Sequence, residues 1–165
     1  MSRPDSNLDA VLAHVDANLD DSVARLCDLI RMPSVSTDPA YAAECRRTAE
    51  WLASDLAGLG FDASVRDTTG HPMVVGHDHA TDGPHVLFYG HYDVQPVDPL
   101  GLWKTPPFEP TLVPQPSGDT WIVGRGASDD KGQLMTFVEA CRAWKAVTGT
   151  LPVRVSILFE GEEEA

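Results

Sequence analysis

The stretch "HVLFYGHYD", from His85 to Asp93, decides the fold prediction. Its first part is a continuous apolar run, which is typical of a strand that is buried on both faces of a mixed or parallel sheet. In an extended segment, residues two apart face the same side, so His91 and Asp93 are expected to project together while Tyr92 turns away. We therefore predict a central strand that ends by presenting an imidazole and a carboxylate side by side.

Outward from this strand, helical and strand patterns alternate along the chain. The expected elements are one or two helices over residues 7–31, a helix from Tyr41 to Leu59, a strand pair in "DASVRDT" and "PMVVGHD", the central strand, a short strand in "TWIVGRG", a helix over residues 131–147, and a strand in "VRVSILF". Residues 98–120 carry many of the prolines and are expected to be irregular. This alternation predicts an α/β fold with a mixed, mostly parallel sheet flanked by helices.

Length and charge limit the possible functions. The chain has 165 residues, enough for one ordinary domain, and a formal net charge of -13. This charge opposes binding to nucleic acid or to an anionic membrane surface, and it favours a cation or a substrate held through one. The start lacks the plan of a signal peptide, and no stretch reaches the roughly 18 apolar residues of a membrane span. We expect a soluble, cytoplasmic protein.

The cysteines agree with that expectation. Cys27, Cys45 and Cys141 are odd in number, far apart and set in apolar helical patterns without a CxxC pair. We interpret them as buried free thiols, which suit a reducing compartment.

Three polar clusters follow predicted strands or strand turns: "GHYDV", "GRGASDDKG" and "EGEEEA". In an open α/β sheet this is where the ligand crevice lies. The adjacent carboxylates of Asp129 and Asp130 would repel each other by roughly 4 kcal/mol at about 4 Å and an effective dielectric constant of about 20. A divalent cation removes that conflict.

Glu163 and Glu164 would diverge on an extended backbone, so one could bind the metal while the other reaches a metal-bound water. The alternative interpretation of this run is a solvated acidic segment.

Two other motif readings are weaker. Gly124 and Gly126 begin a GxGxxG pattern, but Asp129 replaces its third glycine and would repel a pyrophosphate. His77 and His79 form an H-x-H pair in a polar loop, which we interpret as a solvated turn rather than a metal site.

Taken together, the three clusters resemble the N-terminal part of the catalytic domain of the M20 family of zinc peptidases, in its carnosinase-like dipeptidase branch. The family pattern runs from an apolar strand into H-x-D, then G-R-G-x-x-D-[DN]-K-G, then E-G-x-E-E. The chain carries "GHYDV", "GRGASDDKG" and "EGEEE" in the same order, and the resemblance extends from about Leu26 to the end.

The resemblance implies a role for each matching residue. His91 would bind one zinc ion, Asp129 would bridge two, and Glu164 would bind the second. Asp93 would orient His91, and Glu163 would be the general base. The site would hold two Zn²⁺ ions, with Co²⁺ or Mn²⁺ as possible substitutes.

The resemblance also implies a cis peptide between Asp129 and Asp130, and a function. That function is hydrolysis of the amide bond in dipeptides or small peptides by a water activated at a dizinc site. The alternatives are an N-acyl-amino-acid deacylase of the same family, or an inactive, truncated remnant that binds a metal or a partner. Residues 1–165 are expected to be a fragment that lacks the family's lid or dimerisation domain and its C-terminal catalytic segment. The complete family member is expected to be a homodimer.

Overall fold

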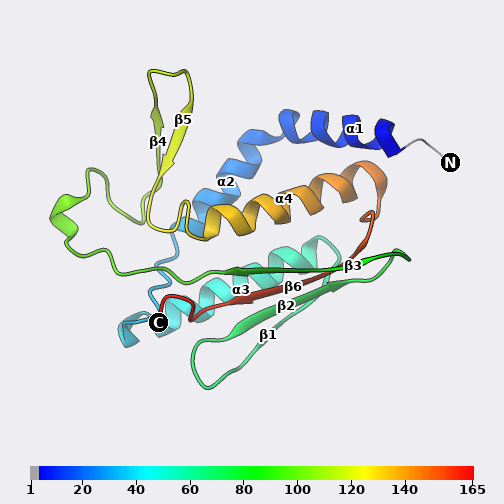
Figure 1. The fold of residues 1–165 in the computed structure, drawn as a ribbon. Helices are drawn as coiled ribbons and strands as arrows, with labels where there is room; N and C mark the ends of the chain where they lie inside the picture. The colour runs from blue at the N-terminus through cyan, green and yellow to red at the C-terminus, as the bar shows by residue number, and fades with distance from the viewer. Residues whose placement is uncertain (1–3) are drawn as a thin grey trace.

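The computed structural model describes residues 4–165 as a four-stranded sheet with helices packed against it, plus a separate two-stranded hairpin (Figure 1). The α-helices are α1 (Pro4–Ala17), α2 (Leu19–Ile30), α3 (Ala42–Gly58) and α4 (Lys131–Thr148), with short 3-10 turns η1 (Pro39–Tyr41) and η2 (Leu100–Leu102). The strands are β1 (Asp62–Arg66), β2 (Met73–Asp78), β3 (His85–His91), β4 (Thr111–Pro114), β5 (Thr120–Val123) and β6 (Arg154–Glu160). The expected helices and strands are all present.

The main sheet has the strand order β1-β2-β6-β3. It is mixed and flanked by helices, as predicted. Within the described residues, however, β1 and β2 pair antiparallel, β2 and β6 pair antiparallel, and only β3 and β6 are parallel. The prediction of a mostly parallel sheet is therefore wrong here, because the hairpin β1–β2 supplies half of the strands and aligns against β6.

β3 was expected to be central, but it lies at the edge of the described sheet. Its side chains Leu87 and Tyr89 are 65% and 49% exposed, whereas Ile157 and Phe159 of β6 are fully buried. β6 comes from a distant part of the sequence and lies between β2 and β3. The apolar pattern of β3 could not show this pairing, and β6 takes the inner position that was predicted for β3.

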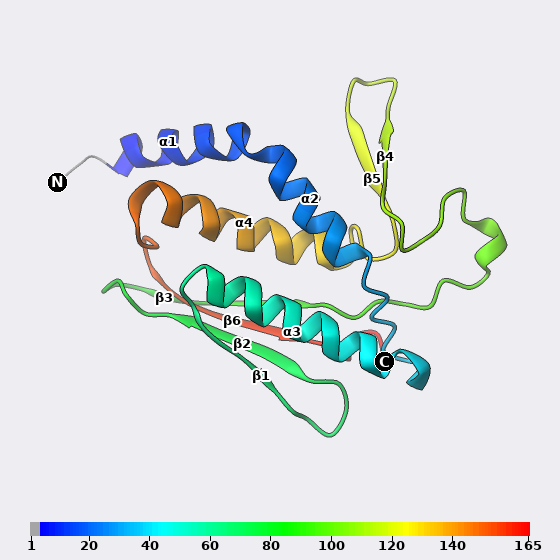
Figure 2. The ribbon, with the colours of Figure 1, turned by 180° about the vertical axis from the view of Figure 1, so that it is seen from behind.

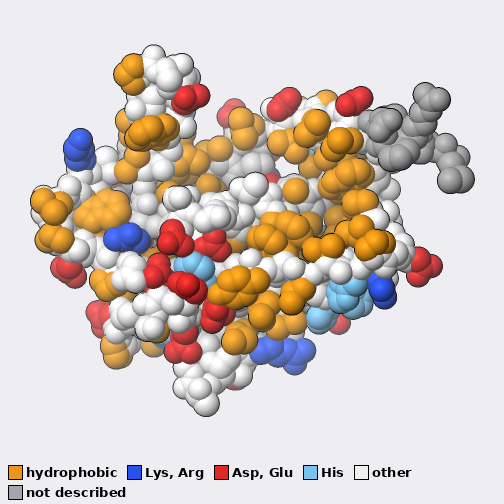
Figure 3. All heavy atoms as spheres, viewed as in Figure 1, with side chains coloured by type: hydrophobic (Ala, Val, Ile, Leu, Met, Phe, Trp, Pro, Cys, Tyr) orange, Lys and Arg blue, Asp and Glu red, His pale blue; other side chains and the backbone are white. Residues whose placement is uncertain are grey.

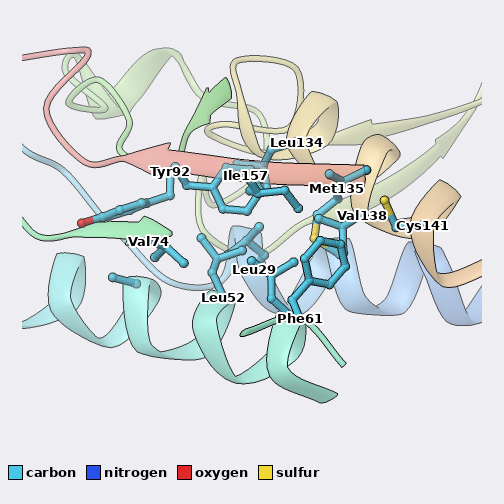
Figure 4. Packing of buried hydrophobic residues seen from close by; sticks show 14 of the residues in the cluster. Leu29, Leu52, Phe61, Val74, Tyr92, Leu134, Met135, Val138, Cys141 and Ile157 are labelled. Atoms are coloured by element: carbon cyan, nitrogen blue, oxygen red, sulfur yellow. The ribbon is translucent and has the colours of Figure 1, made fainter. Parts of the chain in front are cut away.

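Helices α3 and α4 cover the same face of the sheet (Figure 2). Phe88, Ile157 and Gly76 are cross-strand partners, so they share a face. Phe88 stacks on Phe137 of α4 with ring centroids 3.9 Å apart, and a Cβ at Gly76 would lie 3.2 Å from Leu56 of α3. The core therefore fills the space between these helices and the sheet (Figure 4).

The other face of the sheet, here called the open face, carries the alternate residues. Leu87, Ser156 and His77 form one row across it, since they are successive cross-strand partners. None of the described helices covers the sheet on this side in either view (Figures 1 and 2). Most side chains there are exposed or partly exposed.

An ion-pair cluster joins α2 to α4, and α4 to α3. The carboxylate of Glu139 accepts hydrogen bonds from Arg25 at 2.7 Å, from Ser22 at 2.8 Å and from Arg142 at 3.0 Å. Arg142 also donates two hydrogen bonds of 2.8 Å to the two oxygens of Asp55. We call these residues the α2–α4 ion-pair cluster.

The segment expected to be irregular, residues 98–120, contains η2 and β4. β4 pairs with β5 in a hairpin that stands away from the main sheet (Figure 1). Trp121 on β5 is 61% exposed, because its strand joins this hairpin rather than the sheet.

The three cysteines are buried and unpaired, as predicted. Burial raises the pKa of Cys45 to about 11 and that of Cys141 to about 12. These thiols act as small apolar core residues.

Among the described residues, no helix combines the length and the apolar character needed to cross a bilayer.

Candidate metal centre

The polar clusters meet at the end of the sheet where β3 and β6 finish. β3 and β6 run parallel and end together, with His91 paired to Glu160. The "GRGASDDKG" turn reaches the same end, because α4 begins at Lys131 directly after Asp130. Figure 3 shows the resulting group of acidic side chains around a histidine. The expectation that the clusters lie together beyond the strand ends is thus met.

His91, Asp129 and Asp130 form the centre of this group. The Nε2 atom of His91 lies 3.0 Å from Oδ1 of Asp129, and the backbone N–H of His91 donates to Oδ2 of Asp130 at 3.0 Å. One ligand atom from each of the three residues lies within 4.8 Å of the others. The peptide between Asp129 and Asp130 is cis, as the family resemblance implied. His91 is buried, while the Asp129 side chain is 73% exposed and faces outward.

Asp93 is fully buried and holds two of the clusters together. Its Oδ2 accepts hydrogen bonds from Oγ of Ser36 at 2.7 Å and from the backbone of Glu164 at 2.9 Å. Its Oδ1 accepts from the backbone of Glu163 at 3.3 Å and lies 3.4 Å from Nδ1 of His91. Asp93 and His91 therefore face the same side, as the spacing predicted, and Asp93 fixes the "EGEEE" turn against β3.

Residues 34–36, a short segment after α2, pack against the loop that follows β3 at residues 92–94. Val35 and Val94 form an isolated parallel bridge, and the backbone N–H of Val94 donates to the carbonyl of Ser34 at 3.0 Å. The hydroxyl of Ser34 donates to the carbonyl of Tyr92 at 2.7 Å. Together with the bond from Ser36 to Asp93, these contacts make residues 34–36 a buttress for the loop that carries the site.

The surroundings of His91 favour a positive charge. Burial alone lowers the pKa of His91, but the negative charges of Asp93 and Asp130 and the hydrogen bond to Asp129 outweigh burial and raise it. Burial raises the pKa of Asp130, more than its hydrogen bond from the His91 backbone lowers it. One imidazole thus faces several carboxylates, and a cation at this point would relieve the excess of negative charge.

Glu163 and Glu164, the last two of the four glutamates in "EGEEE", diverge. Oε2 of Glu163 lies 3.9 Å from Nε2 of His91, and the Glu163 side chain is half exposed. The carboxylate of Glu164 instead accepts a hydrogen bond from Gln95 at 2.5 Å, outside the group formed by His91 and the two aspartates. The assignments of Glu163 as general base and Glu164 as ligand stay predictions.

Two contributors were missed from the sequence. Asp130 was named for its repulsion of Asp129 and for the cis peptide between them but not as part of the site, although an Asp-Asp doublet beside a metal motif could have suggested that both take part. The position of the Asp130 carboxylate also explains why residue 90 is a glycine, because a Cβ there would lie 2.9 Å from Oδ2 of Asp130. Ser36 carried no signal, since only the tertiary fold brings it to Asp93.

Lys131 was also missed. It is fully buried, and its Nζ donates to the carbonyls of Leu29 at 3.1 Å and Met32 at 2.6 Å. Burial lowers its pKa to about 7. Lys131 thereby ties the turn that holds the aspartates to the end of α2.

Comparison with known proteins gives this geometry a context. A model of peptidase family M20/M25/M40 matches residues 87–165. The Cys-Gly metallodipeptidase dug1 of Schizosaccharomyces pombe is 33% identical over 96% of the chain and 35% of its own length. The human Beta-Ala-His dipeptidase is 31% identical over 99% of the chain and 34% of its own length.

A solved structure gives the same result. Human carnosine dipeptidase 1 superposes with a TM-score of 0.85 at 30% identity, over 96% of the chain and 35% of that structure. The chain therefore spans about a third of the length of the relatives it matches. The match includes the sheet, the flanking helices and the three polar motifs, and the chain belongs to peptidase family M20/M25/M40, in the branch that includes these dipeptidases.

Proposed function

We propose that the protein is a metal-dependent dipeptidase that hydrolyses the amide bond of dipeptides or small peptides. The observation that carries the proposal is the convergence of His91, Asp129 and Asp130 at one edge of the sheet, with ligand atoms within 4.8 Å of one another. The relatives named as Cys-Gly and Beta-Ala-His dipeptidases support the choice of substrate class.

The residues present fit a zinc-type centre. Imidazole nitrogen and carboxylate oxygen are both zinc ligands, and cobalt or manganese accept similar donor sets. The buried imidazole of His91 and the outward-facing carboxylate of Asp129 lie 3.0 Å apart, so both could contact one ion. The raised pKa of Asp130 is further support, because burial is its main cause and, among the described residues, no arginine or lysine forms an ion pair with this carboxylate.

In this proposal His91 would hold one Zn²⁺ ion, Asp129 would contact both ions, and Glu164 would hold the second. Glu164 would have to exchange its hydrogen bond with Gln95 for the metal, a change that its place at the end of an exposed turn permits. Bound zinc would supply a water of lowered pKa and would polarise the scissile carbonyl.

Asp93 positions His91 in this scheme. Nδ1 of His91 lies 3.2 Å from the backbone carbonyl oxygen of Asp93 and 3.4 Å from its carboxylate, so Nε2 points toward Asp129 and the proposed metal position. Such partners set the ring orientation of a ligand and raise its basicity. Three hydrogen bonds hold the Asp93 carboxylate in place.

Glu163 would act as the general base. Its Oε2 lies 3.9 Å from Nε2 of His91, which puts it next to any water held at the metal centre. Its side chain would accept the proton of the attacking water and return it to the nitrogen of the departing amine. The Glu163 carboxylate is half exposed and has no arginine or lysine partner in the described part of the chain, so it can move by the small distance that these transfers need.

The experiment is a substrate panel with the purified protein. Rates of hydrolysis of Cys-Gly and β-Ala-His are compared with those of N-acetyl and N-succinyl amino acids, with Zn²⁺, Co²⁺ or Mn²⁺ added after chelation. The proposal expects dipeptide hydrolysis that depends on added metal. Faster cleavage of the N-acyl compounds would identify a deacylase, and metal binding without any hydrolysis would identify an inactive remnant.

A further inference from the structure

Three histidines gather at the end of the sheet opposite to the metal centre. His77 lies near the end of β2, His79 just beyond it, and His85 begins β3. His77 Nδ1 is 2.8 Å, His85 Nε2 2.7 Å and His79 Nε2 3.5 Å from Oγ of Ser156. We propose that this histidine trio is a second metal site, for a divalent transition-metal ion that prefers imidazole ligands.

The sheet register creates the trio. His77 and Ser156 are direct partners across the β2–β6 pair, and His85 is the partner of Arg154, two residues before Ser156 on the same face. His79 folds back from the turn, with its ring centroid 5.3 Å from that of His77 and 5.1 Å from that of His85. The histidines visible on this part of the surface lie together in Figure 3.

The three histidines are exposed residues, yet their ring nitrogens approach the same hydroxyl oxygen, that of Ser156. Ser156 lies on the open face, but it is only 6% exposed, while His77, His79 and His85 are exposed residues. The hydroxyl of Ser156 gathers the three ring nitrogens, although ordering each exposed side chain costs conformational entropy. A metal ion shared by the three imidazoles would make use of this arrangement.

The donor set indicates the class of ion. Three imidazoles are a known zinc ligand set, and imidazole also suits Cu²⁺ and Ni²⁺. Among the described residues, only His91, Asp129 and Asp130 bring three ligand atoms within 4.8 Å of one another, so the ligand atoms of the histidine trio are farther apart. Ring rotation is therefore needed for coordination, and exposed side chains rotate within picoseconds to nanoseconds.

The neighbouring charges are compatible with a cation. Asp62 is the partner of His77 across the β1–β2 pair and shares its face, so its carboxylate can approach the ion or orient the ring. Arg154 is the partner of His85, but its Nε donates to the carbonyl of Gly83 at 3.2 Å. Asp78 faces away from the trio and forms an ion pair with Lys145.

The trio is separate from the proposed catalytic centre. His85 and His91 are the first and last residues of β3, so about 20 Å of extended strand lies between them. The two sites share no residue, and each can be removed without touching the other.

The test measures Zn²⁺ and Ni²⁺ binding by calorimetry on chelator-treated protein. The protein carries the Asp129→Ala substitution, which weakens the first centre. We expect one remaining ion per chain, bound at least about tenfold more weakly after His77→Ala with His85→Ala. His14→Ala, on α1, is the matched histidine control and should change nothing.

Two further variants separate metal binding from a structural role. Ser156→Ala keeps all three imidazoles, so the site should bind Zn²⁺ within about threefold of its unmodified affinity. If hydrogen bonding were the only role of the cluster, the double histidine variant would leave Zn²⁺ binding unchanged. In protein with Asp129 intact, the double histidine variant should keep its dipeptidase rate, which also reports correct folding. Equal Zn²⁺ stoichiometry and affinity with and without the trio would overturn the proposal, whatever the outcome for dipeptide hydrolysis.

Discussion

The metal centre and the α2–α4 ion-pair cluster both collect charged side chains, but they balance charge differently. In the ion-pair cluster, Glu139 faces two guanidinium groups, and Arg142 is shared with Asp55. In the metal centre, one imidazole faces several carboxylates, and no arginine or lysine forms an ion pair with them among the described residues.

The pKa shifts express the same difference. Burial raises the pKa of Glu139, but its hydrogen bonds and attraction to Arg25 and Arg142 outweigh burial and lower it. Burial raises the pKa of Asp130, and no comparable partner brings it back. A charge cluster that serves stability is thus neutralised by the chain itself, whereas a cluster that binds a metal leaves negative charge for the ion to neutralise.

The largest effect is expected from Asp129→Ala. It removes a proposed bridging ligand, so we expect Zn²⁺ affinity at the centre to fall at least about 100-fold and dipeptide hydrolysis to be lost. The free energy of unfolding without metal should not fall, because the substitution relieves repulsion. Calorimetry and chemical denaturation measure the two quantities, with exposed Asp9→Ala as the charge-matched control. A stability loss with intact metal binding would place Asp129 among structural charges instead.

Glu163→Gln separates catalysis from binding within the metal centre. The amide keeps the size of the side chain but cannot accept the proton, so we expect the hydrolysis rate to fall roughly 100- to 10,000-fold. Zn²⁺ affinity should stay within about threefold, since Glu163 is not a proposed ligand. An active Glu163→Gln enzyme would rule out the general base assigned here.

Glu139→Gln tests the opposite region. It removes a charge that is paired and mostly buried, so we expect the free energy of unfolding at pH 7 to fall by roughly 1–3 kcal/mol, with metal binding unchanged. The lowered pKa of Glu139 contributes stability that is complete above its ordinary value of 4.5 and is lost as pH falls through the folded-state value. Denaturation curves of the two proteins should therefore converge in acid; a constant difference down to pH 3 would contradict the assignment.

Ser36→Ala should have the smallest effect. It removes the 2.7 Å hydrogen bond to Asp93 but leaves the other bonds to that carboxylate. We expect Zn²⁺ affinity to fall by about tenfold or less, because outer partners of this kind orient ligands without binding the ion. Ser128→Ala, at an exposed position near the site, serves as control, and equal affinities in the two variants would remove Ser36 from the support of the centre.

Local patterns predicted the elements and the meeting of the motifs, because they depend on periodicity and on chain order around strand ends. They failed where pairing between distant segments decides the outcome. The apolar run of β3 was predicted to be central, although β6 separates it from β2, and residues 98–120 were predicted to be irregular, although β4 within them pairs with β5.

The same limit applied to the sites. His91 and Asp93 could be placed by their spacing, whereas the contact of Ser36 with Asp93 spans a long stretch of chain and has no local signature. The H-x-H pair was interpreted as a solvated turn because His85 and Ser156 join it only through the sheet register.

The buttress formed by residues 34–36 has a practical consequence for dividing the molecule. The family match begins at residue 87, which would suggest that residues 87–165 are a self-sufficient catalytic piece. Such a piece would lack the hydroxyl that anchors Asp93 and the backbone bridge to Val94, and it would leave Lys131 without its carbonyl partners at Leu29 and Met32. Any portion meant to shape this centre must therefore include the end of α2 and residues 34–36, well before the first of the three motifs.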